Sequence, residues 1–516
     1  MMKSKRLAAG LLAVLTAFSV AGCGSSDSSG TSTESKSDAS DSSVNDVDQY
    51  DFSHDDISVA DTETIKSMDD ISDEEKELIW LSYFDINPTR ANPEKRTDLD
   101  LFEKKGGKIK YDKTNSLEKY TKLADEILAG SPPDMFWYEG NMTFPYNVTR
   151  GMFQPVDKIV DFNSDLWKDV KELADTFVLN GEHYVAPINL VTTTVLTYDK
   201  DVIEAAQLDD PHELWVNGEW NWNTWEDLMT QYVKGATGDE ERYGVYGWFQ
   251  QFIFYSTGET LIKFDADKQE YYSNIDNPDL ERAAQFLYDL DKNQLFMHEG
   301  WIGDCAECLN KNVLFYAMGP WASSADHTPK DGVNWGNVPL PSDPTKDKNY
   351  IVPDINAYMW VAGSKKDVAM KTWNECAKIV YTDDKYKQID REKFNASNPN
   401  WDDDMYEVAY NLLYTDYYTM ISDPCNAINT EISDNDAATN DSKKAVARLM
   451  YDSVMDADED GVQYTWTQLK ETYKPVFDRG IKEINDMYKK FLAGDKSALK
   501  EEVNSKADEK KEDSSK

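Results

Sequence analysis

Aromatic side chains next to carboxylates and amides stand out in this sequence, and this combination suits the binding of sugars. Trp137, Tyr138 and Glu139 follow one another directly after a short apolar segment that we predict to be a strand. The apolar C–H face of a sugar stacks on an aromatic ring, while carboxylates and amides orient its hydroxyls. The 516 residues include 15 Trp and 29 Tyr. The residue types therefore suggest carbohydrate capture.

The charge balance restricts the class of partner. Lys and Arg total 54 and Asp and Glu total 96, which gives a formal net charge of −42. Such a chain repels nucleic acid and anionic lipid surfaces and favours neutral or cationic ligands. Its aromatic content of 12% is too high for a disordered acidic chain. We expect a folded protein that does not bind nucleic acid.

The amino-terminal residues predict secretion and lipid anchoring. Residues 1–22 contain a basic start and an apolar core that is too short to span a bilayer as a stable anchor. The run Ser-Val-Ala-Gly-Cys that ends at Cys23 resembles a bacterial lipobox, in which this cysteine carries acyl chains such as palmitate. Residues 23–75 then form a lipidated, disordered tether rich in Ser and Asp. We expect an extracytoplasmic protein that is lipid-anchored to the cell membrane.

The next segments have the pattern of an α/β fold. Residues 78–84, 108–111 and 134–137 have strand character, and apolar residues at helical spacing predict a helix over 115–129 that Gly130 caps. Strands that alternate with helices predict a parallel sheet with helices on both faces. Ligands of such sheets bind beyond the carboxyl ends of the strands. Helices are expected again over 445–492.

Several motifs resemble, in order and spacing, the extracellular solute-binding proteins of ABC importers, in the carbohydrate-type family 1 that includes maltose-binding protein. The resemblance is dense over 78–385 and looser to 492. The motifs are Gly-Ser-Pro-Pro-Asp-Met-Phe-Trp (130–137), Gly-Glu-His-Tyr-Val-Ala-Pro (181–187), Leu-Thr-Tyr-Asp-Lys (196–200), Trp-Asn-Trp-Asn-Thr-Trp (220–225), Ala-Met-Gly-Pro-Trp-Ala (317–322), Gly-Val-Asn-Trp-Gly (332–336), Pro-Leu-Pro (339–341) and Ala-Gly-Ser-Lys-Lys (362–366).

This resemblance implies a two-lobed, hinged α/β clamp of the periplasmic-binding-protein-like type II fold, with a ligand cleft between the lobes. Such a protein captures a carbohydrate, here an oligosaccharide, and delivers it to ABC permease subunits in the membrane. The N-lobe is expected over 76–190 plus about 352–390, and the C-lobe over 191–351 plus about 391–494. A charged, disordered tail follows over 495–516. We expect a monomer with no cofactor and no enzymatic activity.

The resemblance also implies ligand contacts. Trp137 falls at the stacking position of the first lobe, and Trp321 falls at the main stacking position of the second. Second-lobe contacts are expected at Trp248, and polar contacts of the first lobe near Asp85. We further expect contacts from the second interlobe crossing, because crossing strands line the cleft. The complete predicted set is Trp137, Trp321, Trp248, Phe249, Gln250, Asp85, Glu139, Asp354, Asn356 and Tyr358.

The chain departs from this pattern in two places. At the first crossing the family has an acidic sugar contact, whereas this chain has Thr192, and the residues after Trp137 are not the Asp-Arg pair of maltose-binding protein. Maltose is therefore not assigned as the ligand. The clustered Trp220, Trp222 and Trp225 are expected to pack in the core.

Two motifs suggest metal binding, but neither is complete. Cys305 and Cys308 are spaced as C-x-x-C with no second cysteine pair at zinc-finger spacing, and a disulfide among Cys305, Cys308, Cys376 and Cys425 is open. Residues 456–461 match the first half of a calcium loop, but Thr467 stands where the bidentate Glu belongs. We expect no metal site.

Two other functions compete with transport. A lipid-anchored glycoside hydrolase would need an acid/base carboxylate pair, and with 96 carboxylates such pairs are not diagnostic. The chain has no Ser-nucleophile elbow, zinc-protease motif or phosphate loop. A glycan-binding or sensory surface protein without an importer would need the same fold and site.

Overall fold

The computed structural model describes residues 65–90, 93, 95–329, 333–429, 431–433, 445–455 and 463–501. The predicted signal peptide, Cys23, most of the tether, the 456–461 motif and most of the tail lie outside the described residues. Among the helices in the described ranges, none is both long and apolar enough to cross a membrane.

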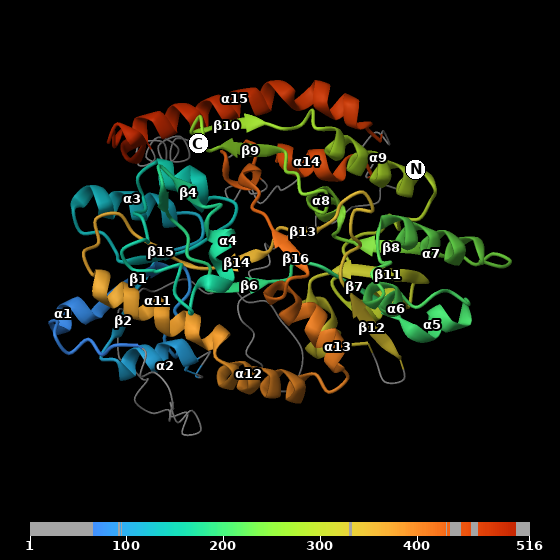
Figure 1. Cartoon of the computed structure of the whole chain (residues 1–516), viewed down its shortest axis with the longest axis horizontal. Coiled ribbons are helices and arrows are strands. Elements are labelled where there is room, and N and C mark those ends of the chain that lie inside the picture. The colour runs from blue at the N-terminus through green and yellow to red at the C-terminus, as the bar shows by residue number, and fades with distance from the viewer. Residues whose placement is uncertain are drawn as a thin grey trace, which may run out of the picture.

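One four-stranded sheet forms the part of the molecule that we call the N-lobe (Figure 1). Its order is β15-β3-β1-β2, with β1 parallel to β2 and β3, and β15 antiparallel to β3. The predicted helix ends at Gly130, which has the expected left-handed backbone (φ 77°). The elements are α1 (Asp73–Lys76), β1 (Glu77–Ser82), α2 (Thr97–Lys104), β2 (Lys108–Lys113), α3 (Lys119–Ala129), β3 (Met135–Trp137), α4 (Lys171–Ala174), β4 (Val178–Leu179), β5 (Glu182–His183), β15 (Tyr358–Trp360) and α11 (Asp367–Thr382).

A second four-stranded sheet, in the order β12-β7-β11-β8, forms the C-lobe. All six residues of β11 are buried, because this strand lies between β7 and β8. Trp220, Trp222 and Trp225 are buried as expected. The elements are β7 (Val195–Asp199), α5 (Lys200–Ala205), α6 (Pro211–Val216), α7 (Trp222–Lys234), β8 (Tyr243–Gly247), α8 (Gln250–Tyr255), β9 (Ile262–Asp265), β10 (Glu270–Ser273), α9 (Pro278–Lys292), α10 (Cys305–Leu309), β11 (Val313–Met318) and β12 (Trp335–Val338).

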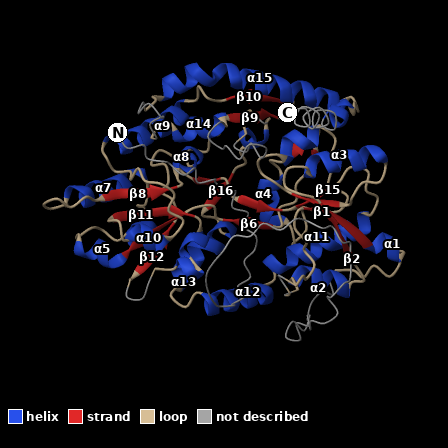
Figure 2. Cartoon of the chain, turned by 180° about the vertical axis from the view of Figure 1, so that it is seen from behind, coloured by secondary structure: helices blue, strands red, loops and turns tan. Residues whose placement is uncertain are grey.

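Two short strand pairs lie in the middle of the molecule, between the two sheets (Figures 1 and 2). β6 (Asn189–Val191) pairs antiparallel with β14 (Asp354–Asn356), and β13 (Asn349–Ile351) pairs parallel with β16 (Tyr418–Met420). The chain leaves the N-lobe sheet before β6 and returns to it after β14, so these pairs connect the lobes.

The carboxyl-terminal helices also link the lobes. α15 (Trp466–Leu492) extends across both halves of the molecule in Figure 1. Near its start Trp466 packs on Phe254 of the C-lobe, and near its end Phe491 packs on Tyr184 of the N-lobe. The helices that precede it are α12 (Asp384–Ser397), α13 (Asp403–Tyr406) and α14 (Val446–Asp452).

Gly247, the last residue of β8, positions the chain where the C-lobe sheet ends. Its φ is 124°, and a Cβ at this position would lie 1.9 Å from the carbonyl oxygen of Ala317 in β11. Only glycine fits such a close approach. The same carbonyl oxygen accepts a hydrogen bond of 2.7 Å from the backbone N–H of Trp248. Gly247 therefore helps to fix the backbone position from which the Trp248 side chain extends.

We expect Gly247→Ala to lower the free energy of unfolding by about 2–5 kcal/mol, because it combines backbone strain with a clash against β11. Denaturant titration followed by circular dichroism measures this change. Gly300→Ala is the control, since a Cβ there meets no atom within 4 Å. An unchanged transition midpoint for Gly247→Ala would show that β8 and β11 are not held this closely.

Candidate functional site

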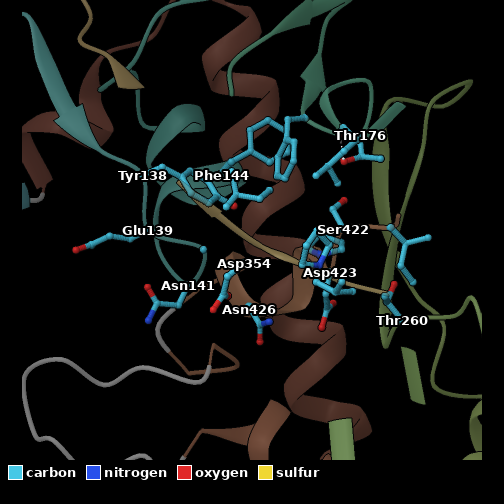
Figure 3. A pocket seen from close by; sticks show the side chains of 18 of the residues that line it. Tyr138, Glu139, Asn141, Phe144, Thr176, Thr260, Asp354, Ser422, Asp423 and Asn426 are labelled. Atoms are coloured by element: carbon cyan, nitrogen blue, oxygen red, sulfur yellow. Dashed lines mark hydrogen bonds between the residues drawn. The ribbon is translucent and has the colours of Figure 1, made fainter. Parts of the chain in front are cut away.

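A cavity of about 960 Å³ lies between the lobes. One wall comes from the N-lobe, the floor from β14 and the segment before it, and the other wall from α8, β9, β10 and the segment after β16. Figure 3 shows Asp354 of β14 between Asn141 of the N-lobe and Asn426 after β16. A molecule in this cavity would therefore contact residues of both lobes.

Trp137 ends β3 and lines the cavity from the N-lobe side. Its partly buried ring makes edge contacts with Trp80, Phe84 and Tyr358, at centroid distances of 6.4, 5.9 and 5.4 Å. Contacts on several sides hold the ring in place, so it is a rigid surface for a ligand.

Glu139 also lines the cavity, but its carboxylate is already engaged. It forms an ion pair with Lys119 and accepts a hydrogen bond of 2.8 Å from the Tyr120 hydroxyl. The Lys119 ammonium lies 5.0 Å from the ring centroid of Tyr83, another cavity residue. This part of the wall is close to electrically neutral, with polar atoms that can still accept hydrogen bonds from a ligand.

Asp354 and Asn356 reach the cavity from β14. The Asp354 side chain is open to solvent, yet the protein around it desolvates the carboxyl and raises its pKa to about 6. Within the described residues, no hydrogen bond or ion pair engages the Asp354 carboxylate. The same negative charge, together with burial, raises the pKa of the adjacent Tyr138. Asp354 is thus a carboxylate available to hydroxyl donors.

Asp423 lines the opposite side of the cavity and has a different role. Its Oδ2 accepts hydrogen bonds from the Tyr255 hydroxyl (2.8 Å) and the Tyr451 hydroxyl (3.0 Å). Its Oδ1 accepts one from the backbone N–H of Cys425 at 2.9 Å. Burial raises the pKa of Asp423, and these bonds partly offset that effect. The residue secures the segment after β16.

Three tryptophans form a separate cluster beyond the carboxyl ends of β8 and β11, which we call the indole row: Trp248, Trp301 and Trp321. The ring centroids of Trp248 and Trp301 are 5.0 Å apart, and those of Trp301 and Trp321 are 6.4 Å apart. None of the three is among the residues that line the described cavity. The indole row is therefore a second aromatic surface, on the C-lobe.

The structure groups only some of the predicted site residues. Trp137, Glu139, Asp354 and Asn356 line the cavity together. Trp248 and Trp321 lie in the indole row instead.

Phe249, Gln250, Tyr358 and Asp85 line neither surface among the described residues. Phe249 is fully buried and packs on Trp225 and Phe296, because the backbone after Gly247 turns this ring into the core. Gln250 is buried, and its Oε1 accepts a hydrogen bond of 3.1 Å from the Phe249 N–H.

Tyr358 and Asp85 are held by local contacts. Tyr358 is buried, and its hydroxyl accepts a hydrogen bond of 2.7 Å from Arg96. Asp85 Oδ1 accepts hydrogen bonds from the backbone N–H (2.9 Å) and side-chain amide (2.8 Å) of Asn87. These four residues are engaged in the fold and do not reach the cavity.

The sequence reasoning missed Trp301, Lys119 and Gln251. Trp301 stands in Gly-Trp-Ile-Gly, and a tryptophan flanked by glycines in a loop is a feature that could have indicated an exposed ring. Gln251, the second residue of α8, lines the cavity, whereas Gln250, the first residue of this helix, does not. Lys119 pairs with Glu139 across 20 positions, which no local pattern indicates.

The described residues contain no group of three or more His, Cys, Asp or Glu side chains placed to hold a metal ion. Cys305 and Cys308 lie in the short helix α10, and burial raises the pKa of the Cys308 thiol. All four cysteines in the described part of the chain are buried, and no disulfide joins them.

Comparison with known proteins identifies relatives of the chain. A family model described as bacterial extracellular solute-binding protein matches residues 100–374, which is more than half of the chain. An uncharacterized ABC transporter extracellular-binding protein from Pyrococcus horikoshii is 23% identical over 237 residues, 43% of this chain. The match spans 50% of the length of that curated relative.

Solved structures share the fold at low sequence identity. A sugar-binding protein from Xanthomonas citri is 16% identical, with 81% of this chain and 98% of that one covered and a TM-score of 0.52. A sugar transporter from Rhizobium etli in an open conformation is 15% identical, with coverage of 80% and 99% and a TM-score of 0.51. An uncharacterized protein from Listeria monocytogenes is 14% identical, with coverage of 78% and 100% and a TM-score of 0.53. These likenesses show the two-lobed type II fold.

We expect Asp354→Asn to raise the melting temperature at pH 7.5, on the order of 2 °C, because it removes an ionised carboxyl from the cavity. The raised pKa means that the folded protein binds this proton more tightly than the unfolded chain. The ionised carboxyl of Asp354 therefore destabilises the folded state above about pH 6. This destabilisation disappears as the pH falls towards the pKa that Asp354 has in the unfolded chain. The difference between variant and wild type should shrink by pH 4.5 in scanning calorimetry.

Asp265→Asn is the matched control. Its partly exposed carboxylate pairs with Lys268, which lowers the pKa of Asp265, so this substitution should not raise the melting temperature at either pH. A pH-independent gain for Asp354→Asn would contradict the assignment of an ionised carboxyl in the cavity.

Proposed function

The chain belongs to the bacterial extracellular solute-binding protein family, and we propose that it captures an uncharged oligosaccharide outside the cell and delivers it to the permease subunits of an ABC importer. The observation that carries this proposal is the cavity with walls from both lobes, which combines an aromatic face with carboxylate and amide groups. Two proteins that share the fold are a sugar-binding protein and a sugar transporter, in agreement with the proposed ligand.

The chemistry of the cavity favours a neutral polyhydroxylated ligand. Trp137 offers an apolar face for a sugar ring, while Asp354 and Asn356 offer acceptor and donor atoms for its hydroxyls. A charged ligand would need a compensating charge, but Glu139 with Lys119 and Lys263 with Glu259 already form opposite-charge pairs. Among the described residues, no ion pair compensates Asp354 or Asp423, and the Asp354 carboxylate is open to hydroxyl donors that can solvate its charge.

Binding in this arrangement is a two-state closure. A ligand that contacts both lobes stabilises the closed form only by its extra affinity for that form. Contacts from Trp137 on the N-lobe and from Trp321 on the C-lobe would provide this difference. The indole row is where the C-lobe offers aromatic surface, and the β6–β14 pair is the hinge about which the lobes move.

Catalysis is not part of the proposal. A glycoside hydrolase needs one carboxyl as acid and another as base or nucleophile. Of the cavity carboxylates that come from the N-lobe, Glu139 is neutralised by Lys119 and bound by Tyr120, and Asp175 forms an ion pair with Lys171. Incubation with oligosaccharides should return them unchanged by chromatography, whereas turnover would support the enzyme.

The importer distinguishes this function from that of a glycan-binding or sensory surface protein. Permease genes next to the gene for this chain would support transport. Growth on the bound oligosaccharide should also require the protein, whereas a sensory protein would change gene expression without being needed for uptake.

We expect Trp137→Ala and Trp321→Ala each to weaken oligosaccharide binding by about 1–3 kcal/mol, because each removes an aromatic anchor from one lobe. A thermal-shift screen against defined oligosaccharides finds the ligand, since binding to the folded state raises the melting temperature. Titration calorimetry then gives the affinities.

Trp215→Ala is the control for these variants, because Trp215 is a partly buried tryptophan on α6 that packs on Tyr417 and belongs neither to the cavity lining nor to the indole row. It should bind like the wild type. Wild-type affinity in both Trp137→Ala and Trp321→Ala would refute the proposed site.

We expect the anchor to depend on Cys23, which lies outside the described residues. Wild-type protein should incorporate a palmitate analogue in cells and sediment with membranes, because acyl chains insert into the bilayer. Cys23→Ser should lose the label and leave the membrane fraction. A membrane-bound Cys23→Ser protein would contradict lipid anchoring at this residue.

A further inference from the structure

Trp301 is unusual among the tryptophans of the chain. All fifteen lie in the described residues, and it alone is exposed, with half of its surface open to solvent. Burial of a large apolar side chain contributes on the order of 2 kcal/mol, so an indole left in water forgoes stabilisation. This exposure calls for a physical reason.

The exposure does not arise from a loosely held loop. The Tyr246 hydroxyl donates to the carbonyl oxygen of Gly300 (2.7 Å) and accepts from the N–H of Ile302 (2.8 Å). The Tyr316 hydroxyl donates to the carbonyl oxygen of Ile302 at 3.0 Å. Two buried tyrosines of β8 and β11 therefore fix the backbone on both sides of Trp301 and hold its ring outward.

The neighbouring rings extend this surface in two directions. The planes of Trp301 and Trp321 are 23° from parallel, so their faces point in similar directions, and the plane of Trp248 is tilted by 42°. Gly319 makes room for Trp321, because a Cβ there would lie 2.5 Å from the indole Nε1. The three rings therefore form one aromatic cluster, exposed at Trp301 and partly buried at Trp248 and Trp321, with ring spacings comparable to the length of a pyranose unit.

The charged groups beside the indole row are paired. The Arg448 guanidinium lies 5.9 Å from the Trp248 ring and forms an ion pair of 2.6 Å with Asp452. His327 packs edge-on against Trp321, and its Nδ1 lies 3.1 Å from Asp304 Oδ2. The surface therefore offers no strong field to an ion and suits an uncharged ligand.

Polar atoms also lie beside the indole row. Thr193 is close to Trp321, since a Cβ at Gly319 would lie 3.1 Å from its carbonyl oxygen. The hydroxyls of Thr192 and Thr193 are buried and have no hydrogen-bond partner among the described residues.

We propose that the indole row binds successive units of an extended oligosaccharide, with Trp301 as the middle contact that makes the protein prefer longer chains to mono- and disaccharides. The proposal rests on the proposed function and adds the length of the ligand. Trp321 contacts the unit nearest the crossing segment, and Trp301 and Trp248 contact the units that extend away from it.

The test measures affinity against chain length. Titration calorimetry uses linear malto-, cello-, xylo- and mannooligosaccharides from the disaccharide to the hexasaccharide. For the series that binds, wild-type affinity should rise with each added unit. Trp301→Ala should lose about 3- to 10-fold for the longest chains while the disaccharide changes less than about twofold. Trp301→Phe should retain part of the increase in affinity with chain length.

Tyr272→Ala is the matched control, because Tyr272 is an exposed aromatic residue on β10, outside the indole row. It should follow the wild-type length dependence. Since Trp301 is half exposed, all variants should keep the wild-type melting temperature.

The outcomes separate this proposal from the proposed function. If no oligosaccharide binds the wild type, the proposed function fails and this inference fails with it. If the wild type binds but Trp301→Ala shows the full wild-type gain with chain length, the inference is overturned and the proposed function stands. Equal losses for short and long chains would also overturn it, because Trp301 would then act on the whole site.

Discussion

The antiparallel pairing of β6 with β14 is the constraint on which the site depends. It aligns Val191 with Asp354 and Asn189 with Asn356, so that residues more than a hundred positions apart form the floor of one cavity. Tyr414 secures the pair from outside, since its hydroxyl accepts from the Leu190 N–H at 2.9 Å. Because this pair connects the two sheets, its geometry helps to determine which faces of the lobes meet a ligand.

Charge compensation explains how a chain with a net charge of −42 can have a cavity whose N-lobe wall is nearly neutral, as the proposed uncharged ligand requires. Glu139 is paired with Lys119, Asp423 is bound by two tyrosine hydroxyls, and Arg448 beside the indole row is paired with Asp452. The excess negative charge thus lies mainly elsewhere. Asp354 differs from these residues because no donor or cation among the described residues engages its carboxyl, and the raised pKa of Asp354 reflects the cost of its charge.

Local patterns in the sequence predicted much of the fold. The strand over 134–137, the helix that ends at Gly130 and the burial of Trp225 all follow from hydrophobic spacing and capping. The two-lobed arrangement came from the resemblance of the motifs, and the family match agrees with it. Strand pairing between distant segments, such as β6 with β14, has no local signature.

The structure brings only some of the predicted site residues together, for a physical reason. The direction of a side chain after a strand depends on the turn that follows. Gly247 bends the chain so that Trp248 stays partly exposed while Phe249 enters the core. Trp137, Glu139, Asp354 and Asn356 were predicted from strand ends and the crossing, and they do line one cavity. Trp301 was missed because its exposure depends on hydrogen bonds from Tyr246 and Tyr316, which lie on other strands.

The most direct measurement is a crystal structure of the protein bound to the oligosaccharide that the thermal-shift screen identifies. The account predicts one intact, uncharged glycan in contact with Trp137 and Asp354 from the N-lobe side and hinge, and with Trp321 from the C-lobe. A glycan held by a single lobe, or a charged molecule in the cavity with Asp354 as its counter-ion, would contradict it.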